Sequence, residues 1–74
     1  MLENCVVMNA RVLRIRPEAL LVRDRDTGQT VQVNTPLARR FRIGQRLRIV
    51  YNGAMTMSIP PQISPWRISP QGRW

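Results

Sequence analysis

Hydrophobic and polar residues alternate along most of this chain with a period of two, which is typical of half-buried β-strands. The alternating runs cover residues 5–16, 20–25, 30–34, 46–51 and 54–59. In the first run the apolar phase slips by one residue, from the face that holds Val12 to the face that holds Leu13 and Ile15. This slip predicts a long first strand that contains a β-bulge.

Turn and breaker residues separate the runs. Asp26-Thr27-Gly28 indicates a tight turn, and Asn52-Gly53 is the strongest hairpin signal in the chain. Pro60-Pro61 ends the last run, because proline cannot donate to a strand ladder. We therefore predict that residues 46–51 and 54–59 form an antiparallel hairpin about Asn52-Gly53.

A short helix is predicted between the third and fourth runs. Thr35 is a suitable N-cap, and Pro36 would occupy the first helical position. Leu37 and Phe41 are four residues apart and would share one helix face, and Gly44 would end the element.

Three strands, a short helix and two more strands follow the order of an OB-fold. An SH3-like barrel is the alternative, but its helical turn normally lies between the last two strands. We therefore predict an all-β, five-stranded OB-fold-like barrel over residues 1–64, followed by an extended C-terminal tail over residues 65–74. The predicted core consists of Val12, Val22, Val33, Phe41, Leu47, Ile49 and Tyr51.

The 74 residues allow one domain with a small core. The single cysteine, Cys5, excludes an intrachain disulfide, and the four scattered acids (Glu3, Glu18, Asp24, Asp26) do not suggest a metal site. The small core would then be stabilised by closure of a barrel or by oligomerisation. We find no targeting or membrane-spanning segment, so we expect a cytoplasmic protein without a membrane partner.

The residue types needed for most catalytic mechanisms are missing. The chain has no histidine and no lysine, which excludes Ser-His-Asp and Cys-His arrangements, Schiff bases and a Walker lysine. Asp24 and Asp26 alternate with Arg23 and Arg25 beside a turn, which favours solvated ion pairs over a catalytic carboxylate pair. We expect a binding module without enzymatic activity, cofactor or metal.

All twelve basic residues are arginines, and the net charge is +8. Such an excess favours a polyanionic partner, usually nucleic acid. Codon usage in a G+C-rich genome is an alternative reason for choosing arginine over lysine, but it does not explain the excess over acids. On an OB-fold, the nucleic-acid-binding residues would be Arg11, Arg16, Arg23, Arg25, Gln32 and Asn34.

The predicted site lacks an aromatic platform, because Phe41 and Tyr51 are assigned to the core and Trp66 and Trp74 to the tail. Without base stacking, binding of single-stranded nucleic acid would be weak, non-specific and steeply salt-dependent. We expect Arg11, Arg23 and Arg25 to form one outward cluster, and Arg46 and Arg48 to lie on the outer face of another strand. The alternative function is a protein–protein interaction or self-association, through a strand edge or the proline-rich tail.

The segment Tyr-Asn-Gly-x-Met-Thr-x-Ser-x-Pro-Pro-Gln-Ile, at residues 51–63, resembles part of a family of small bacterial domains of unknown function. Members carry a Gly-Asp-x-Val strand, a Tyr-Asx-Gly turn and a Ser-x-Pro-x-Gln segment, and the similarity extends over residues 11–68. The chain departs from them at Gln45, where aspartate is usual, and at Pro65 and Pro70. The resemblance implies an OB-like barrel, either as a lone cytoplasmic protein or as part of a lipoprotein, and implies no reaction or cofactor.

Overall fold

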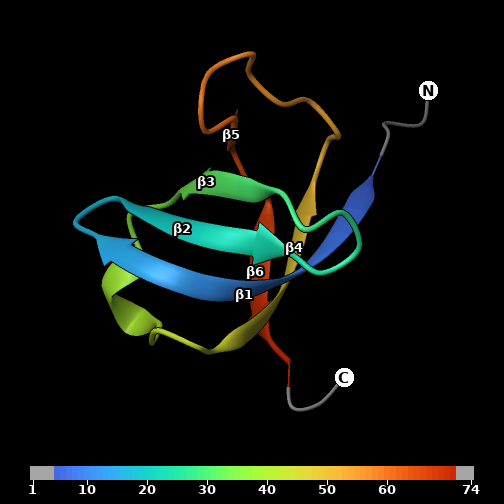
Figure 1. The fold of residues 1–74 in the computed structure, drawn as a ribbon. Helices are drawn as coiled ribbons and strands as arrows, with labels where there is room; N and C mark the ends of the chain where they lie inside the picture. Colours follow the sequence, from blue (N-terminus) through green and yellow to red (C-terminus); the bar gives the residue numbers. More distant parts are fainter. Residues whose placement is uncertain (1–4, 72–74) are drawn as a thin grey trace.

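The computed structural model describes residues 5–71, which form one six-stranded sheet with the order β5-β3-β2-β1-β4-β6 (Figure 1). The elements are β1 (Val6–Arg16), β2 (Ala19–Asp24), β3 (Thr30–Asn34), the 3₁₀ turn η1 (Ala38–Arg40), β4 (Arg46–Tyr51), β5 (Gln62–Ile63) and β6 (Arg67–Pro70). The all-β prediction is confirmed. The predicted five-stranded barrel is wrong, because the sheet has six strands and is not closed.

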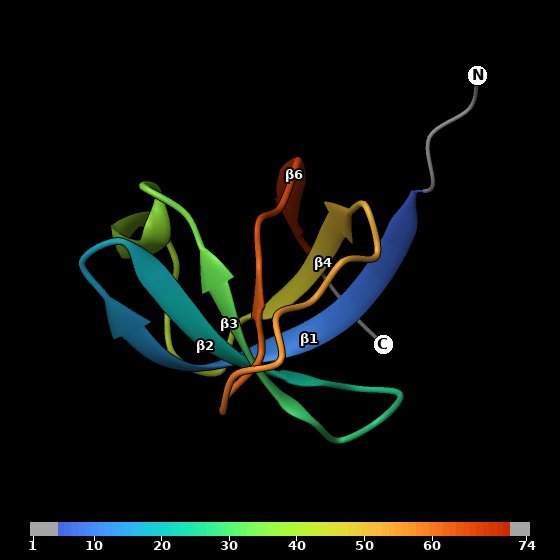
Figure 2. The ribbon, with the colours of Figure 1, turned by 90° about the horizontal axis from the view of Figure 1, so that it is seen from above.

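The long strand β1 organises the sheet. Its first half pairs with β4 and its second half with β2, so β1 curves between the two halves (Figure 2). The register with β2 shifts between Val12 and Arg14, which confirms the predicted bulge. Because one extra residue reverses the side-chain alternation, Arg14 and Arg16 are exposed, whereas Ile15 packs against the core.

The predicted hairpin about Asn52-Gly53 does not form. Gly53 has a φ of +90°, and Asn52 Oδ1 accepts a hydrogen bond from the Ala54 amide at 2.9 Å, so the chain turns here. Residues 54–59, however, belong to no strand, and Thr56 and Ser58 make their hydrogen bonds within loop 52–61 and its junction with β5.

The second edge of β4 is taken by β6 instead. Ile49 lies opposite Ile68, which packs against the core, and the backbone of Arg48 pairs with Ser69. Because β1 already occupies the other edge of β4, a local hairpin and β6 compete for a single edge. The predicted C-terminal tail is therefore corrected: residues 67–70 are a strand of the sheet.

β5 and β6 lie at the two ends of the strand order, although residues 64–66 alone separate them in the chain. β5 pairs in parallel with β3, where Val33 lies opposite Ile63, and β6 pairs antiparallel with β4. One extended segment, residues 62–70, thus supplies a strand to each edge of the sheet. Ile63 is 2% exposed, so this segment also completes the core.

The predicted helix is reduced to the 3₁₀ turn η1. Thr35 does accept a hydrogen bond through Oγ1, from the Leu37 amide at 3.1 Å, but Leu37 is 47% exposed and Ala38 is the buried residue. A single 3₁₀ turn buries only one of its residues, so Leu37 and Phe41 do not lie on a common buried face. No helix in residues 5–71 is long and apolar enough to span a membrane.

The core lies on the concave side of the curved sheet. Six of the predicted core residues are buried: Val12, Val22, Val33, Leu47, Ile49 and Tyr51. Phe41 is only half-buried and packs against the edge of this cluster. Leu20, Val31 and Ile63 complete the core as further fully buried side chains.

Candidate functional site

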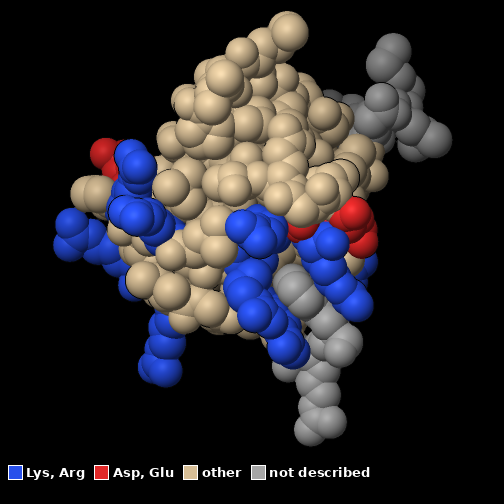
Figure 3. All heavy atoms as spheres, in the orientation of Figure 1, with Lys and Arg blue, Asp and Glu red and all other residues tan. Residues whose placement is uncertain are grey.

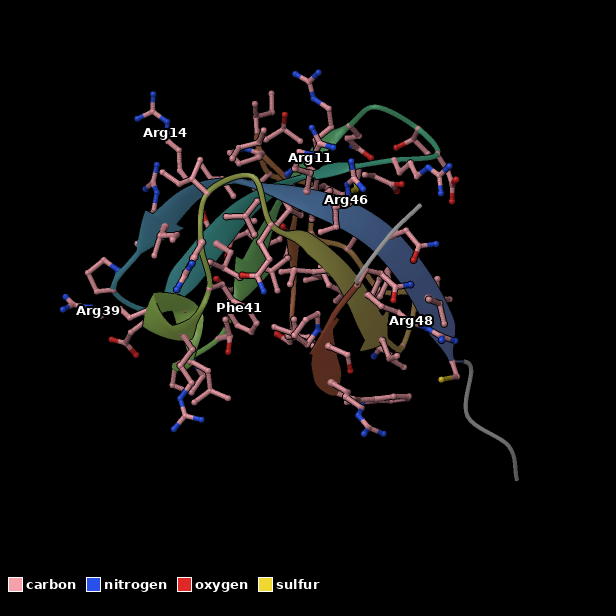
Figure 4. All side chains as sticks on the ribbon, turned by 90° about the horizontal axis from the view of Figure 1, so that it is seen from below. Arg11, Arg14, Arg39, Phe41, Arg46 and Arg48 are labelled. Carbon is pink, nitrogen blue, oxygen red and sulfur yellow. The ribbon has the colours of Figure 1, made fainter. Side chains whose placement is uncertain are left out.

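The convex side of the sheet carries a row of arginines across three neighbouring strands. Arg11 on β1 lies directly opposite Arg23 on β2 and directly opposite Arg46 on β4. Each of them is next to a buried residue of its own strand (Val12, Val22 and Leu47), so all three side chains point away from the core. Figure 4 shows Arg11 and Arg46 beside each other.

A second row lies two residues further along the strands. The amide of Arg25 donates to the carbonyl of Asn9 at 2.8 Å, Asn9 lies opposite Arg48, and Arg48 lies opposite Ser69 on β6. Arg67 extends the pattern on β6, opposite Val50. We call the six outward residues Arg11, Arg23, Arg25, Arg46, Arg48 and Arg67 the arginine face.

Two hollows lie within the arginine face. The first, of about 360 Å³, is lined by Arg11, Arg23 and Arg25 around Leu13, the residue at the bulge. The second, of about 400 Å³, lies over β4 and β6 and is lined by Arg48, Val50, Arg67, Ser69 and Gln71. Each hollow combines guanidinium groups with an apolar side chain.

Positive charge dominates one part of the surface. The blue spheres of Figure 3 lie on the left side and over the lower part of the molecule, and its uppermost part shows none. Residues 49–66, which include loop 52–61, contain no charged residue. Among the described residues, the carboxylates are Glu18 and Asp26, in turns, and Asp24, at the end of β2. Of the eleven arginines in residues 5–71, six therefore make up the arginine face, and the other five lie in the second half of β1 and in or just after η1.

The predicted site residues divide into three groups. Arg11, Arg23 and Arg25 come together, as expected. Arg16 is exposed but lies beyond the bulge, opposite Ala19 at the β1–β2 turn, so it is not part of the arginine face. Arg46 lies on the outer face of a different strand, β4, as expected, and it is also the cross-strand neighbour of Arg11.

Gln32 and Asn34 have a structural role. Gln32 Nε2 donates to Asn34 Oδ1 at 2.9 Å, and Asn34 Nδ2 donates to Gln62 Oε1 at 3.2 Å. This chain of amides joins β3 to β5 beside the parallel pairing of the two strands. The side-chain amides of both predicted residues therefore form hydrogen bonds at the sheet edge.

Sequence reasoning missed Arg46 and Arg67 as members of the same surface. Arg46 belongs to an alternating strand whose outward face was correctly predicted, but its neighbour across the sheet was not. Arg67 fell in the predicted tail, where no strand signal was recognised. Only the strand order of the sheet would have shown that both arginines lie on the arginine face.

The other polar chemistry of the described residues is sparse. No group of three or more His, Cys, Asp or Glu side chains that would suit a metal ion comes together in residues 5–71. Tyr51 is buried, and desolvation, followed by the nearby charge of Asp24, raises the pKa of its hydroxyl above the ordinary 10.0. A tyrosine in this state stays protonated near neutral pH and acts as a core residue.

Neither protein-family models, nor curated proteins, nor solved structures gave a match to this chain. The site is therefore interpreted from its own residues.

Proposed function

We propose that the arginine face binds a polyanion, and specifically the phosphate backbone of single-stranded nucleic acid. The observation that carries this proposal is the row Arg23–Arg11–Arg46, in which like charges stand directly opposite each other on neighbouring strands. Like charges at opposite positions destabilise a sheet. A bound anion that bridges Arg11 and Arg23 would offset this repulsion through its attraction to both.

The spacing of the arginine face suits a chain of phosphates. Neighbouring strands lie about 4.8 Å apart, and residues on one face of a strand recur about every 6.7 Å, so the guanidinium groups form a grid. Guanidinium groups bind phosphate oxygens through two parallel hydrogen bonds, and they also stack on bases. The net charge of +8 adds long-range attraction to any polyanion.

We further propose that the fold is an OB-type barrel opened between β5 and β6. OB barrels are partly open, and they bind oligonucleotides over strands 2 and 3 and the adjoining loops. Here residues 64–66 alone separate the strands at the two edges of the sheet, which supports this relationship. The arginine face differs from the usual OB surface in being centred on β1 and β4.

The test compares two double variants that each remove two positive charges. Arg11→Ala/Arg23→Ala alters the row, and Arg39→Ala/Arg40→Ala alters exposed arginines of η1, at a distance from Arg46 (Figure 4). Titration of a labelled single strand of about 12 nucleotides, within the usual OB site size, measures Kd at several salt concentrations. We expect the row variant to lower the slope of log affinity against log salt by about 1.4, that is about 0.7 per lost phosphate contact.

The control variant should weaken binding less, because it loses general attraction but no contact. Equal weakening by both variants would mean that the oligonucleotide responds only to net charge. Absence of binding at about 50 mM salt, where electrostatic association is strong, would overturn the proposal altogether.

A second candidate function is self-association through loop 52–61, and a specific observation favours it. Met57 and Ile59 are fully exposed, at 102% and 101%, on a segment without charged residues. Exposed apolar clusters of this kind mark contact surfaces. A second copy of a +8 protein is repelled by the arginine face, but two uncharged ends can meet.

Sedimentation velocity tests this second candidate. We expect the dimer fraction to rise with salt, which screens the repulsion, and to be lost in Met57→Ser/Ile59→Ser. A monomer at all salt and protein concentrations would exclude self-association through this loop.

A further inference from the structure

We propose that the hollow beside Trp66 holds a nucleobase of the single strand whose phosphates lie on the arginine face. This inference rests on the proposed function and adds to it the part of the ligand that is not phosphate. Trp66, which the sequence analysis placed in a tail, would then be the aromatic platform for base stacking.

Trp66 is held in place by its backbone while its ring stays accessible. It lies between β5 and β6, and its amide donates to the Val50 carbonyl at 2.8 Å. Its side chain is 52% exposed, which is unusual for so large an apolar group in a small domain. The root of the side chain is therefore positioned by the sheet, whereas an aromatic surface remains for a ligand.

Trp66 lines two hollows. The larger, of about 420 Å³, is formed with Asn52, Ala54, Met55, Thr56, Gln62, Ser64 and Pro65. The smaller, of about 220 Å³, lies toward η1 and includes Phe41 and Ile68. A planar ring stacked on the indole would occupy the larger hollow, because loop 52–61 supplies polar groups there.

Those polar groups have hydrogen-bonding capacity left. Gln62 accepts from Asn34 through Oε1, and Asn52 accepts from the Ala54 amide through Oδ1. Among the described residues, no partner is found for the side-chain NH₂ groups of these two amides, or for the hydroxyl of Ser64. Amide side chains read the donor and acceptor pattern of base edges.

The charge of the hollow argues for a base and against a phosphate. Residues 49–66, which supply every lining residue of the larger hollow, are uncharged. A phosphate buried there would lose hydration without a cation to replace it. A neutral, planar, hydrogen-bonding group has no such penalty and gains the stacking energy of the indole.

Trp66 links the hollow to the arginine face along the chain. Arg67 follows Trp66 directly and lies opposite Val50, and with Arg48 it lines the hollow over β4 and β6. A phosphate held by Arg48 and Arg67 therefore places the attached nucleotide at the edge of the sheet where Trp66 stands. From β2 to β6 the face spans three strand spacings, about 14 Å.

Fluorescence and modified oligonucleotides test the inference. In the Trp74→Phe background, Trp66 is the only tryptophan, so its emission reports on its own surroundings. We expect quenching when an oligonucleotide binds, and no quenching by an abasic strand of the same length or by inorganic polyphosphate. Trp66→Ala should weaken binding of the normal strand by about 5- to 150-fold, the usual contribution of one stacked base. The abasic strand should be affected little.

Trp66→Phe keeps an aromatic ring and should retain most of the affinity, which separates stacking from a loss of folding in Trp66→Ala. Equal binding of normal and abasic strands, with no quenching of Trp66, would overturn the base site. If Arg11→Ala/Arg23→Ala still weakens both strands in that case, the proposed function stands without it. If no strand binds at all, the proposed function fails and the base site with it.

Discussion

Ile59 and Ile63 are four residues apart, and the structure places them in opposite environments. Ile59 is 101% exposed in loop 52–61, whereas Ile63 is 2% exposed and lies opposite Val33 in the parallel β3–β5 pair. The alternating pattern of the sequence predicts a strand for Ile59 and none for Ile63. The same truncation at the two positions therefore tests whether residues 62–70 complete the sheet.

The expected magnitude follows from burial. Ile63→Val removes one methylene from the core and should cost about 0.5–1.5 kcal/mol, and Ile63→Ala about 2–5 kcal/mol. Ile59→Val should change stability by less than about 0.5 kcal/mol, as for most surface positions. A domain of 74 residues has a free energy of unfolding of about 4–11 kcal/mol. The comparison of Ile63→Val with Ile59→Val is therefore the quantitative test, because Ile63→Ala would remove much of the free energy of unfolding.

Thermal denaturation followed by circular dichroism measures the difference. One kcal/mol shifts the Tm of a domain of this size by about 4–8 °C, so Ile63→Val should lower Tm by about 2–12 °C. Ile59→Val should lower it by no more than about 2–4 °C. Equal losses at both positions, or a larger loss at Ile59, would refute the argument and restore the hairpin about Asn52-Gly53.

Three further predictions concern single positions. Burial raises the pKa of Tyr51, so the stability that its protonated hydroxyl provides should be complete below pH 10 and should decline as pH rises toward the folded-state pKa. Denaturant titrations at several pH values should show this decline, and Tyr51→Phe should remove it. Gly53→Ala should cost about 1–3 kcal/mol in the same assay, because φ is +90° and the added Cβ would meet a β1 side-chain carbon at 3.1 Å. Deletion of Leu13 should still allow folding, because it removes only the extra residue of the bulge and keeps Arg14 and Arg16 outward, opposite Leu21 and Ala19. Insertion of one alanine after Arg14 should prevent folding, because it would turn Ile15 outward and Arg16 toward the core; a soluble, cooperative insertion variant would contradict this argument.

Local patterns were sufficient for the first two-thirds of the fold. The alternation of residues such as Leu20 and Val22 predicts which side of each strand is buried, because a strand that faces a core on one side needs a period of two. The phase slip near Leu13 predicts the bulge for the same reason. The outward position of Arg11, Arg23 and Arg25 followed from these phases, and the structure brings them together.

Short-range signals were misleading where two segments competed for one strand edge. Asn52-Gly53 is a strong turn signal and the chain does turn there, but a turn does not guarantee that the next residues pair. β6 obtains the edge of β4 because Ile68 packs against the core, opposite Ile49. That outcome depends on contacts between distant parts of the chain, which no local pattern describes.

What the sequence by itself determined is the identity of the outward residues in the first four strands, the excess of positive charge, and the turns. Only the tertiary structure decided the strand order, and with it the two features on which function is argued. The row Arg23–Arg11–Arg46 exists because β1 lies between β2 and β4. Trp66 stands beside a hollow because β5 and β6 pair with opposite edges of the sheet. Alternation specifies the face on which a side chain lies, whereas its neighbours across the sheet depend on which strands pair.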